Sequence, residues 1–330
     1  MIELHSQSPR LCVEVSPSNS SLSVVSLFRE LLASEALDPH YVRIAKGVLA
    51  SWQSSLAPVG GELHLRCLKG GASGLEIVAT ARQSVRFERP ASIASNERFD
   101  AWDGPQGSAV FIRLGEPGPF LDRRYGAIQH TYRNELFCGD SWAMAIGEKT
   151  VALTVLDGLG HGPLAASAAA AGVEAFFRVP FRAPVLAVRN VHAQMGSTCG
   201  GVGALAHFDR ASKVVTFTGA GDVSGRLVGS SGSRGMVSVP GILGRGAPKF
   251  REFQYSGAES LLVLHSDGLR ERWNISDYPG LQLRHPALIA AVLHRDFARL
   301  SDDGTLVIVD LTAFAGGEGG EGGEGGDFGS

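Results

Sequence analysis

The chain has 330 residues, of which 44% are hydrophobic, and it carries a formal net charge of -3 with an isoelectric point near 6.4. This length exceeds a typical single domain of about 100–200 residues, so we expect two domains. Lys and Arg are scattered rather than clustered, which argues against nucleic acid as the main partner. The cysteines lack CxxC spacing, which indicates neither a zinc site nor a disulfide framework and fits a reduced protein.

Neither the N-terminal segment nor the most apolar stretch of the sequence indicates export or a membrane span. The N-terminal segment, MIELHSQSPRLCVEV, lacks the basic region and apolar core of a secretion signal, so we expect a cytoplasmic protein. The most apolar stretch, residues 163–177, is shorter than the roughly 20 residues that a bilayer requires, and it contains Glu174. We predict a buried helix there and no membrane partner.

The first third of the chain mixes helical and strand-like patterns. The spacing of apolar residues predicts helices over 23–32 and 39–52 and strands over 62–67, 75–79 and 109–114. A segment rich in Gly and Pro, residues 114–126, is typical of a linker and places a boundary near Gly118. The sequence therefore predicts a small α/β layer domain over residues 1–118.

Short strand-like runs dominate the rest of the chain. They cover residues 150–156, 202–208, 214–217, 226–228, 261–265 and 305–311. Helices are predicted over 163–177, 184–195 and 286–300, and each begins with Pro, a favoured opening residue. We expect an α+β domain of packed antiparallel sheets with flanking helices over residues 119–314. Residues 315–330 repeat Gly and Glu and are expected to be disordered.

Aspartates recur beside glycines in the motifs CGDSW, VLDGLGHG, LHSDGL and SDDGT. They are Asp140, Asp157, Asp267 and the pair Asp302 and Asp303. Carboxylates that converge without Lys or Arg in the same motifs repel one another unless hard divalent cations lie between them. A single Asp-Gly is most often a plain turn, but four such elements in order predict a Mg²⁺ or Mn²⁺ site.

The ordered series CGDSW, VLDGLGHGPLAASAAAAG, TCGGVGALAHFD, FTGAGDV, LHSDGLRERW and SDDGTLVIV resembles the metal-dependent protein phosphatase (PPM) family. It is most similar to the bacterial branch of stage II sporulation protein E and the phosphatase that resets the stressosome. The resemblance covers about residues 126–311. It implies a four-layer αββα sandwich that hydrolyses phosphoserine or phosphothreonine with two Mn²⁺ or Mg²⁺ ions, which activate the attacking water.

The same resemblance assigns roles to the aspartates. Asp157 is expected to bridge the two cations, with the carbonyl of Gly158 completing one of them, and Asp267 and Asp302 are expected to bind the other. Asp157 and Asp267 are the residues expected to be catalytic. Asp140 is expected to support the metal's water shell. Asp303 ranks below Asp302 as a ligand, because the first position of this pair binds metal in the family.

Other residues near these motifs have both a functional and a structural interpretation. His161 either protonates the leaving oxygen or packs the turn before a helix. Arg133 either binds the substrate phosphate or is solvated surface on a strand. Cys138 lacks the phosphate-cradling loop that a nucleophilic cysteine needs, so we expect a small buried side chain. Gly219 and Gly221 are expected to form a structural hairpin.

The first domain more faintly resembles the anti-sigma-factor kinases of the GHKL ATPase fold. The segments GGELHLRCLKGGASGLEIVATA and GPQGSAVFIRL carry this resemblance. The family's Asn is missing from the helix RIAKGVLASW, and Ala81 stands about where its adenine-reading Asp would be. We therefore expect a degenerate module that binds ATP weakly or not at all and serves for partner docking or dimerisation, or a mere structural appendage.

The leading hypothesis is a cytoplasmic phosphatase acting on a phosphorylated STAS-domain anti-sigma antagonist in a partner-switching or stressosome pathway. The STAS partner is implied by the resemblance alone. Two alternatives are a non-catalytic regulatory scaffold of the same circuit and a two-metal phosphatase of small molecules. The retained aspartates disfavour the scaffold, since a scaffold has no need for clustered charge.

Overall fold

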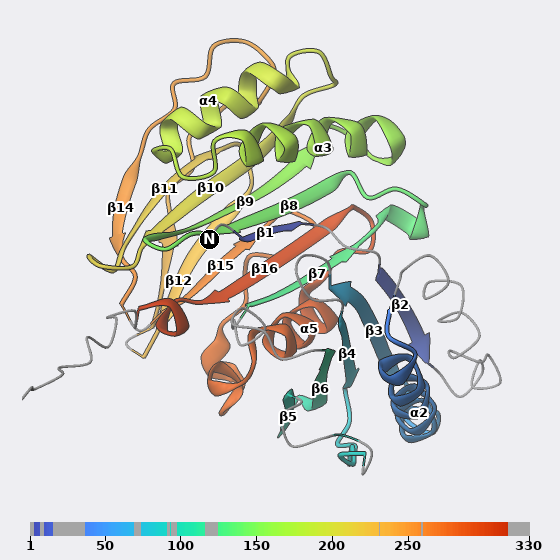
Figure 1. The fold of residues 1–330 in the computed structure, drawn as a ribbon. Helices are drawn as coiled ribbons and strands as arrows, with labels where there is room; N and C mark the ends of the chain where they lie inside the picture. Colours follow the sequence, from blue (N-terminus) through green and yellow to red (C-terminus); the bar gives the residue numbers. More distant parts are fainter. Residues whose placement is uncertain are drawn as a thin grey trace, which may run out of the picture.

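The structure is a computed structural model that describes residues 3–6, 10–15, 37–68, 74–90, 93, 98–115, 125–230, 232–258 and 260–315. These residues form three antiparallel sheets (Figure 1). The first sheet consists, in spatial order, of β1 (Glu3–Ser6), β8 (Asp140–Ile146), β9 (Thr150–Gly158), β10 (Gly201–Asp209), β11 (Val214–Ala220) and β14 (Phe253–Ser256). The second consists of β13 (Gly232–Met236), β12 (Ser224–Gly229), β15 (Leu261–His265), β16 (Gly304–Asp310) and β7 (Tyr125–His130). The third consists of β2 (Arg10–Val15), β3 (Gly61–Leu68), β4 (Gly74–Ala81), β6 (Gly107–Gly115) and β5 (Arg98–Gly104).

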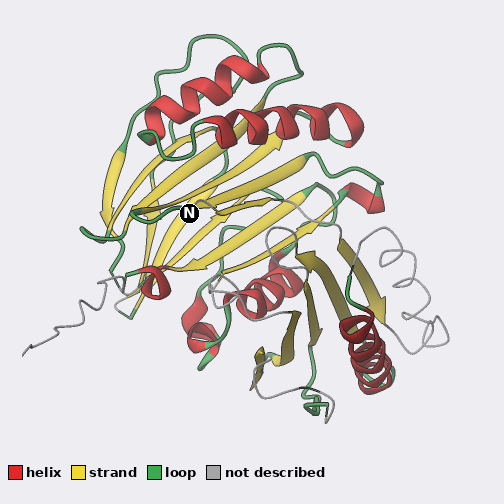
Figure 2. Cartoon of the chain, in the orientation of Figure 1, coloured by secondary structure: helices red, strands yellow, loops and turns green. Residues whose placement is uncertain are grey.

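The first two sheets pack face to face and carry helices on their outer faces. Helices α3 (Gly162–Arg178) and α4 (Pro184–Met195) cover the first sheet, and α5 (Pro286–Phe297) covers the second (red helices in Figure 2). Side-chain alternation explains this arrangement. On β8, Trp142 and Met144 lie in the core between the sheets, whereas Ala143 and Ala145 lie under α3 and α4. The expected αββα sandwich is therefore confirmed.

Proline marks the helix starts, as the sequence predicts. Helix α4 has the predicted bounds, and α3 begins one residue earlier than predicted, at Gly162. Helix α5 ends at Phe297 rather than at 300, because Ala298 adopts an extended conformation and pairs with Leu269. The helix predicted over 39–52 continues to Leu56 as α2 (Pro39–Leu56). The helix predicted over 23–32, the centre of the linker and the tail from residue 316 on lie outside the described residues.

The third sheet extends the stack of layers on the far side of α5. Helix α2 covers one face of this sheet, and α5 lies against the other, where Val78 and Phe111 join its apolar cluster. Helix α5 is thus enclosed between two sheets, which explains why every residue from Pro286 to Arg295 is buried. The predicted small α/β layer corresponds to this sheet with α2, while its likeness to the GHKL fold stays a prediction. One departure concerns residues 3–6, because β1 pairs with β8 in the first sheet.

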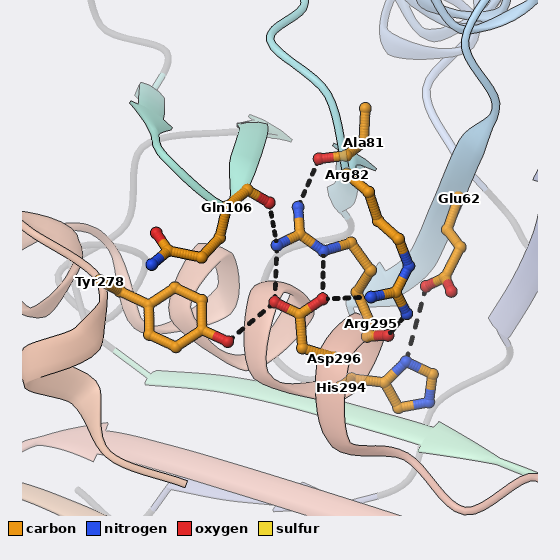
Figure 3. Close-up of polar contacts among 8 residues, drawn as sticks. All are labelled: Glu62, Ala81, Arg82, Gln106, Tyr278, His294, Arg295 and Asp296. Carbon is orange, nitrogen blue, oxygen red and sulfur yellow. Dashed lines mark hydrogen bonds and ion pairs between the residues drawn. The ribbon is translucent and has the colours of Figure 1, made fainter.

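Polar contacts also join the third sheet to the region around α5 (Figure 3). Arg82 Nη1 lies 2.8 Å from Asp296 Oδ1, and Arg295 donates to the backbone oxygens of Ala81 and Gln106. Tyr278 donates a 2.9 Å hydrogen bond to the other carboxylate oxygen of Asp296. Because several of these groups are buried and charged, the contact depends on a defined register between the sheet and the helix.

No helix in the described part of the chain combines the length and apolar character needed to cross a membrane.

Candidate metal centre at the edge of the sandwich

The site begins with a pair of aspartates on neighbouring strands. Asp140 opens β8 and lies directly opposite Asp157 near the end of β9. Both share the parity of Trp142 and Val155, which lie in the core between the sheets, so the two carboxylates point toward the second sheet. Asp140 is fully buried, and Asp157 is half-buried. The strand register therefore places two like charges side by side at the edge of the core.

Two loops of the second sheet approach from the other side. Asp267 follows β15 and Asp302 precedes β16, and these strands are antiparallel neighbours, so both loops lie at the same edge. Ser266 links the loops to the first sheet, because its hydroxyl donates to Asp140 Oδ2 (2.6 Å) and accepts from the backbone N–H of Thr305 (2.9 Å). The structure thus brings the motifs CGDSW, VLDGLGHG, LHSDGL and SDDGT together.

The glycines of these motifs permit close approach of backbone segments. A Cβ atom on Gly268 would lie 2.0 Å from the carbonyl oxygen of Asp303. A Cβ on Gly158 would lie 2.2 Å from the carbonyl oxygen of Ala165, at the start of α3. Neither glycine has a positive φ, so the requirement here is space for the neighbouring backbone rather than an unusual turn.

Burial and mutual repulsion dominate the electrostatics. Burial raises the pKa of Asp157 well above its ordinary 3.8, and the charges of the surrounding aspartates raise it further. Burial likewise raises the pKa of Asp140, although hydrogen bonds from Ser266 and Thr305 oppose the shift. The pKa of Asp267 is also raised, first by burial and then by Asp302. Without a cation, these carboxylates therefore resist ionising together.

The donor set fits hard divalent cations. Within the described residues, the buried oxygens Asp140 Oδ1 and Asp303 Oδ2 have no hydrogen-bond partner, which is costly unless another group binds them. All the side-chain donors of the set are carboxylate oxygens, the ligands that Mg²⁺ and Mn²⁺ prefer. No three of the described aspartates bring oxygens within 4.8 Å of one another. An ion held by Asp157, Asp267 and Asp302 together would therefore require these side chains to move closer to one another on binding.

The two aspartates of SDDGT differ in their surroundings. Asp303 is 2% exposed, and its Oδ1 accepts a 2.9 Å hydrogen bond from the backbone of Tyr132. Asp302 is half-buried, and its Oδ1 accepts from the backbone N–H of Asp303. One oxygen of Asp303 is thus engaged in holding the loop before β8, and the higher rank of Asp302 as a ligand stays a prediction.

The surroundings of His161 at the rim include residues that the sequence analysis did not identify. His161 lies 2.8 Å from Glu135 (Nδ1 to Oε1) and stacks on Tyr132 with ring centroids 4.3 Å apart. Glu135 and Tyr132 belong to no pattern that marks them in the sequence. Asp222, in the hairpin interpreted as structural, adds to the raised pKa of Asp267. Glu135 and Tyr132 position His161, and Asp222 adds negative charge near Asp267.

Arg133 and Cys138 have definite surroundings. The prediction that Arg133 lies on a strand is wrong. The residue lies in a short 3-10 turn with φ of 43°. Its guanidinium lies over the ring of Tyr132, 5.0 Å from the centroid, and its side chain is exposed. Cys138 is buried, and its thiol donates to the carbonyl oxygen of His130 (3.3 Å). This agrees with a structural role for Cys138.

The raised pKa values predict a pH-dependent stability of the metal-free protein. A carboxyl with a higher pKa in the folded state retains its proton at pH values where the unfolded chain has lost it, so the folded state binds more protons. Stability in the presence of EDTA should therefore fall as the pH rises above about 4. Thermal melts from pH 5 to pH 8.5 measure this slope, and Asp157→Asn should reduce it. An equal slope in the variant would contradict the assigned electrostatics.

Comparisons with known proteins bear on the fold. No protein-family model and no curated protein matches the chain. Among solved structures, a chain from a study of the bacterial stressosome is 24% identical with a TM-score of 0.52, covering 56% of this chain and 97% of that chain. RsbX in complex with magnesium is 22% identical with a TM-score of 0.51, covering 55% of this chain and 92% of that chain.

A further neighbour is the PP2C phosphatase domain, with a fragment of the regulatory domain, of SpoIIE from Bacillus subtilis. It is 15% identical with a TM-score of 0.47, and the alignment covers 89% of this chain and 95% of that chain. The sandwich of β7 to β16 with its helices has the fold of RsbX and of the chain from the stressosome study, in agreement with the resemblance of its motifs to the metal-dependent protein phosphatases.

Proposed function

We propose that this protein is a metal-dependent protein serine/threonine phosphatase. The observation that supports this most is the direct pairing of Asp140 with Asp157 at the edge of a sandwich of PP2C type. Like charges held together in a partly buried place carry a free-energy cost that a structural role does not require. A pair of cations at this place turns the same arrangement into a stable one.

The ligands proposed for the two Mn²⁺ or Mg²⁺ ions are Asp157, Asp267 and Asp302, with the carbonyl of Gly158. When bound, the cations supply a more acidic water and neutralise charge on the phosphate. The residues of the chain then divide the remaining work. Asp140, held by Ser266, faces the centre from the buried side and supports its hydration.

His161 stands at the exposed rim, where it is suited to pass a proton to the leaving serine or threonine oxygen. Its Nδ1 faces Glu135 at 2.8 Å, which leaves Nε2 for the substrate side. The stacking of its ring on Tyr132 restricts its orientation. Arg133 is exposed beside the same ring and offers a guanidinium to the substrate phosphate.

The finer proposal concerns the substrate and the partner. We propose a phosphorylated STAS-type anti-sigma antagonist within a partner-switching or stressosome circuit, because the motifs resemble that branch of the PPM family. The third sheet with α2 is proposed to dock a partner protein or to mediate dimerisation. A cytoplasmic location is proposed with this circuit.

The test is hydrolysis of p-nitrophenyl phosphate with Mn²⁺, followed by a panel of phosphoserine and phosphothreonine proteins that includes a STAS domain. We expect Mn²⁺-dependent turnover that EDTA abolishes, with a higher kcat/KM for a phosphoprotein than for the small ester. Turnover of small esters alone would favour the small-molecule phosphatase. Absence of turnover with bound Mn²⁺ would favour the regulatory scaffold.

A further inference from the structure

A second cluster of metal-binding side chains lies between the third sheet and α5, apart from the aspartate motifs. Glu62 and His64 are two residues apart on β3 and therefore point to the same side of the strand. His294 lies in the last turn of α5. Figure 3 shows Glu62 and His294 facing each other across the junction.

The distances within this cluster suit a single small cation. His64 Nε2 lies 2.9 Å from Glu62 Oε2, and His294 Nδ1 lies 3.6 Å from the same oxygen. The possible ligand atoms of the three residues all lie within 4.8 Å of one another. Ligands of a tetrahedral zinc ion are separated by roughly 3.3 Å, given Zn–N and Zn–O distances of about 2.0 Å. Small side-chain movements would therefore complete the geometry.

A hydrogen-bond relay fixes which nitrogen of His294 faces Glu62. His130 Nε2 lies 3.2 Å from the carbonyl oxygen of Arg299, which only accepts, so this nitrogen carries the proton of His130. In its neutral form, His130 then accepts through Nδ1 from His294 Nε2, at 3.0 Å. In neutral His294 the lone pair of Nδ1 then faces the carboxylate of Glu62, so a cation between the two would take the place of the proton that a charged His294 donates to Glu62.

Burial and access also fit a bound ion. The side chains of His64 and His294 are 10% and 6% exposed, whereas that of Glu62 is 26% exposed and provides a route from solvent. Two imidazoles and one carboxylate form a donor set that favours Zn²⁺ over Mg²⁺, with water as the fourth ligand. Behind His294, the ring of His130 and the carbonyl oxygen of Arg299 form a hydrogen-bonded chain. Such hydrogen bonds commonly orient an imidazole that binds a metal.

We propose that Glu62, His64 and His294 form a zinc-type site that joins β3 to α5, with His130 as a positioning residue. Ion binding displaces the proton that His64 shares with Glu62 and releases it to solvent. The site differs in chemistry from the aspartate centre, because it contains nitrogen ligands and spans the third sheet and the sandwich. An occupied site would hold these two parts of the molecule together.

The test titrates the full chain with Co²⁺, a spectroscopic substitute for Zn²⁺, in excess Mg²⁺ that occupies the aspartate centre. We expect one Co²⁺ per chain with the intense visible absorption of a four-coordinate ion, displaced by Zn²⁺. Glu62→Gln and His64→Asn should each weaken binding by more than ~100-fold, since even supporting residues of metal sites contribute about 10–100-fold. Preparing both variants allows for one that does not fold, which circular dichroism reveals.

Two control variants separate this site from others. His40→Asn removes an exposed histidine at the start of α2, and Asp157→Asn alters the aspartate centre, so both should retain the absorption. Absence of the absorption in the unaltered chain would overturn the proposal and leave a protonated His294 paired with Glu62. Absorption that persists in both cluster variants, or that disappears in Asp157→Asn, would overturn it as well.

Discussion

Asp157→Asn is expected to lower the turnover of p-nitrophenyl phosphate with Mn²⁺ by at least ~10³-fold. A loss of this size corresponds to about 4 kcal/mol of transition-state stabilisation, which is within the range of a bridging metal ligand. Asparagine has nearly the same shape, so strand pairing between β9 and β8 is retained. The measurement is kcat at saturating Mn²⁺, with the content of bound metal determined in parallel.

The matched control for this variant is Asp209→Asn, an aspartate at the end of β10 that caps the following turn through Ser212. It should keep its turnover, because it lies at the opposite end of that strand from Gly201, which pairs with Gly158. In EDTA, Asp157→Asn should be at least as stable as the unaltered chain, since it relieves repulsion with Asp140. Full activity of Asp157→Asn would contradict its assignment as a metal ligand.

Glu76→Gln is expected to lower the free energy of unfolding by about 3–5 kcal/mol, because it removes a buried carboxylate that lies between the buried guanidiniums of Arg66 and Arg113. Arg66 Nε donates to Glu76 Oε2 (2.7 Å), and Arg113 Nε donates to Oε1 (2.9 Å). Burial opposes ionisation of Glu76, but the charges of both arginines outweigh it and lower its pKa. Urea denaturation measures the loss.

The control for Glu76→Gln is Glu174→Gln, which breaks an exposed ion pair with Arg178 on α3. It should cost no more than about 0.5 kcal/mol, because solvent screens such pairs. Since Arg66 also lies over the ring of Tyr125 on β7, the loss of Glu76 should loosen the contact between the third sheet and the sandwich. Equal effects of the two substitutions would contradict a buried charge network at this contact.

The sequence predicted the elements whose patterns are local. The strand-like run over 202–208, which forms most of β10, and the prolines that open α4 and α5 need no information from distant residues. Pairings between distant segments were not predictable in this way. The addition of residues 3–6 to the first sheet and the burial of α5 between two sheets depend on contacts far apart in the chain. The early end of α5 follows from the bridge between Leu269 and Ala298, which is also a long-range contact.

The aspartates of the site were predictable because each stands in a short motif beside a strand. The side chains that hold these aspartates and His161 in place could not be predicted from the sequence. Ser266 lies within the motif LHSDGL, but no feature of this motif indicates that its hydroxyl donates to Asp140. Glu135 and Tyr132 meet His161 only after the loop before β8 has folded back. The cluster of Glu62, His64 and His294 joins residues more distant still, so no sequence spacing indicates it.

The most direct measurement of the central claim is a crystal structure of the chain soaked in Mn²⁺, with the ions located by anomalous scattering. We predict two Mn²⁺ ions, with Asp157 in contact with both and Asp267 and Asp302 in contact with one. Their carboxylate oxygens should lie about 2.0–2.6 Å from the metals, the range for hard divalent cations in proteins. Manganese bound elsewhere, with none at Asp157, would contradict the claim.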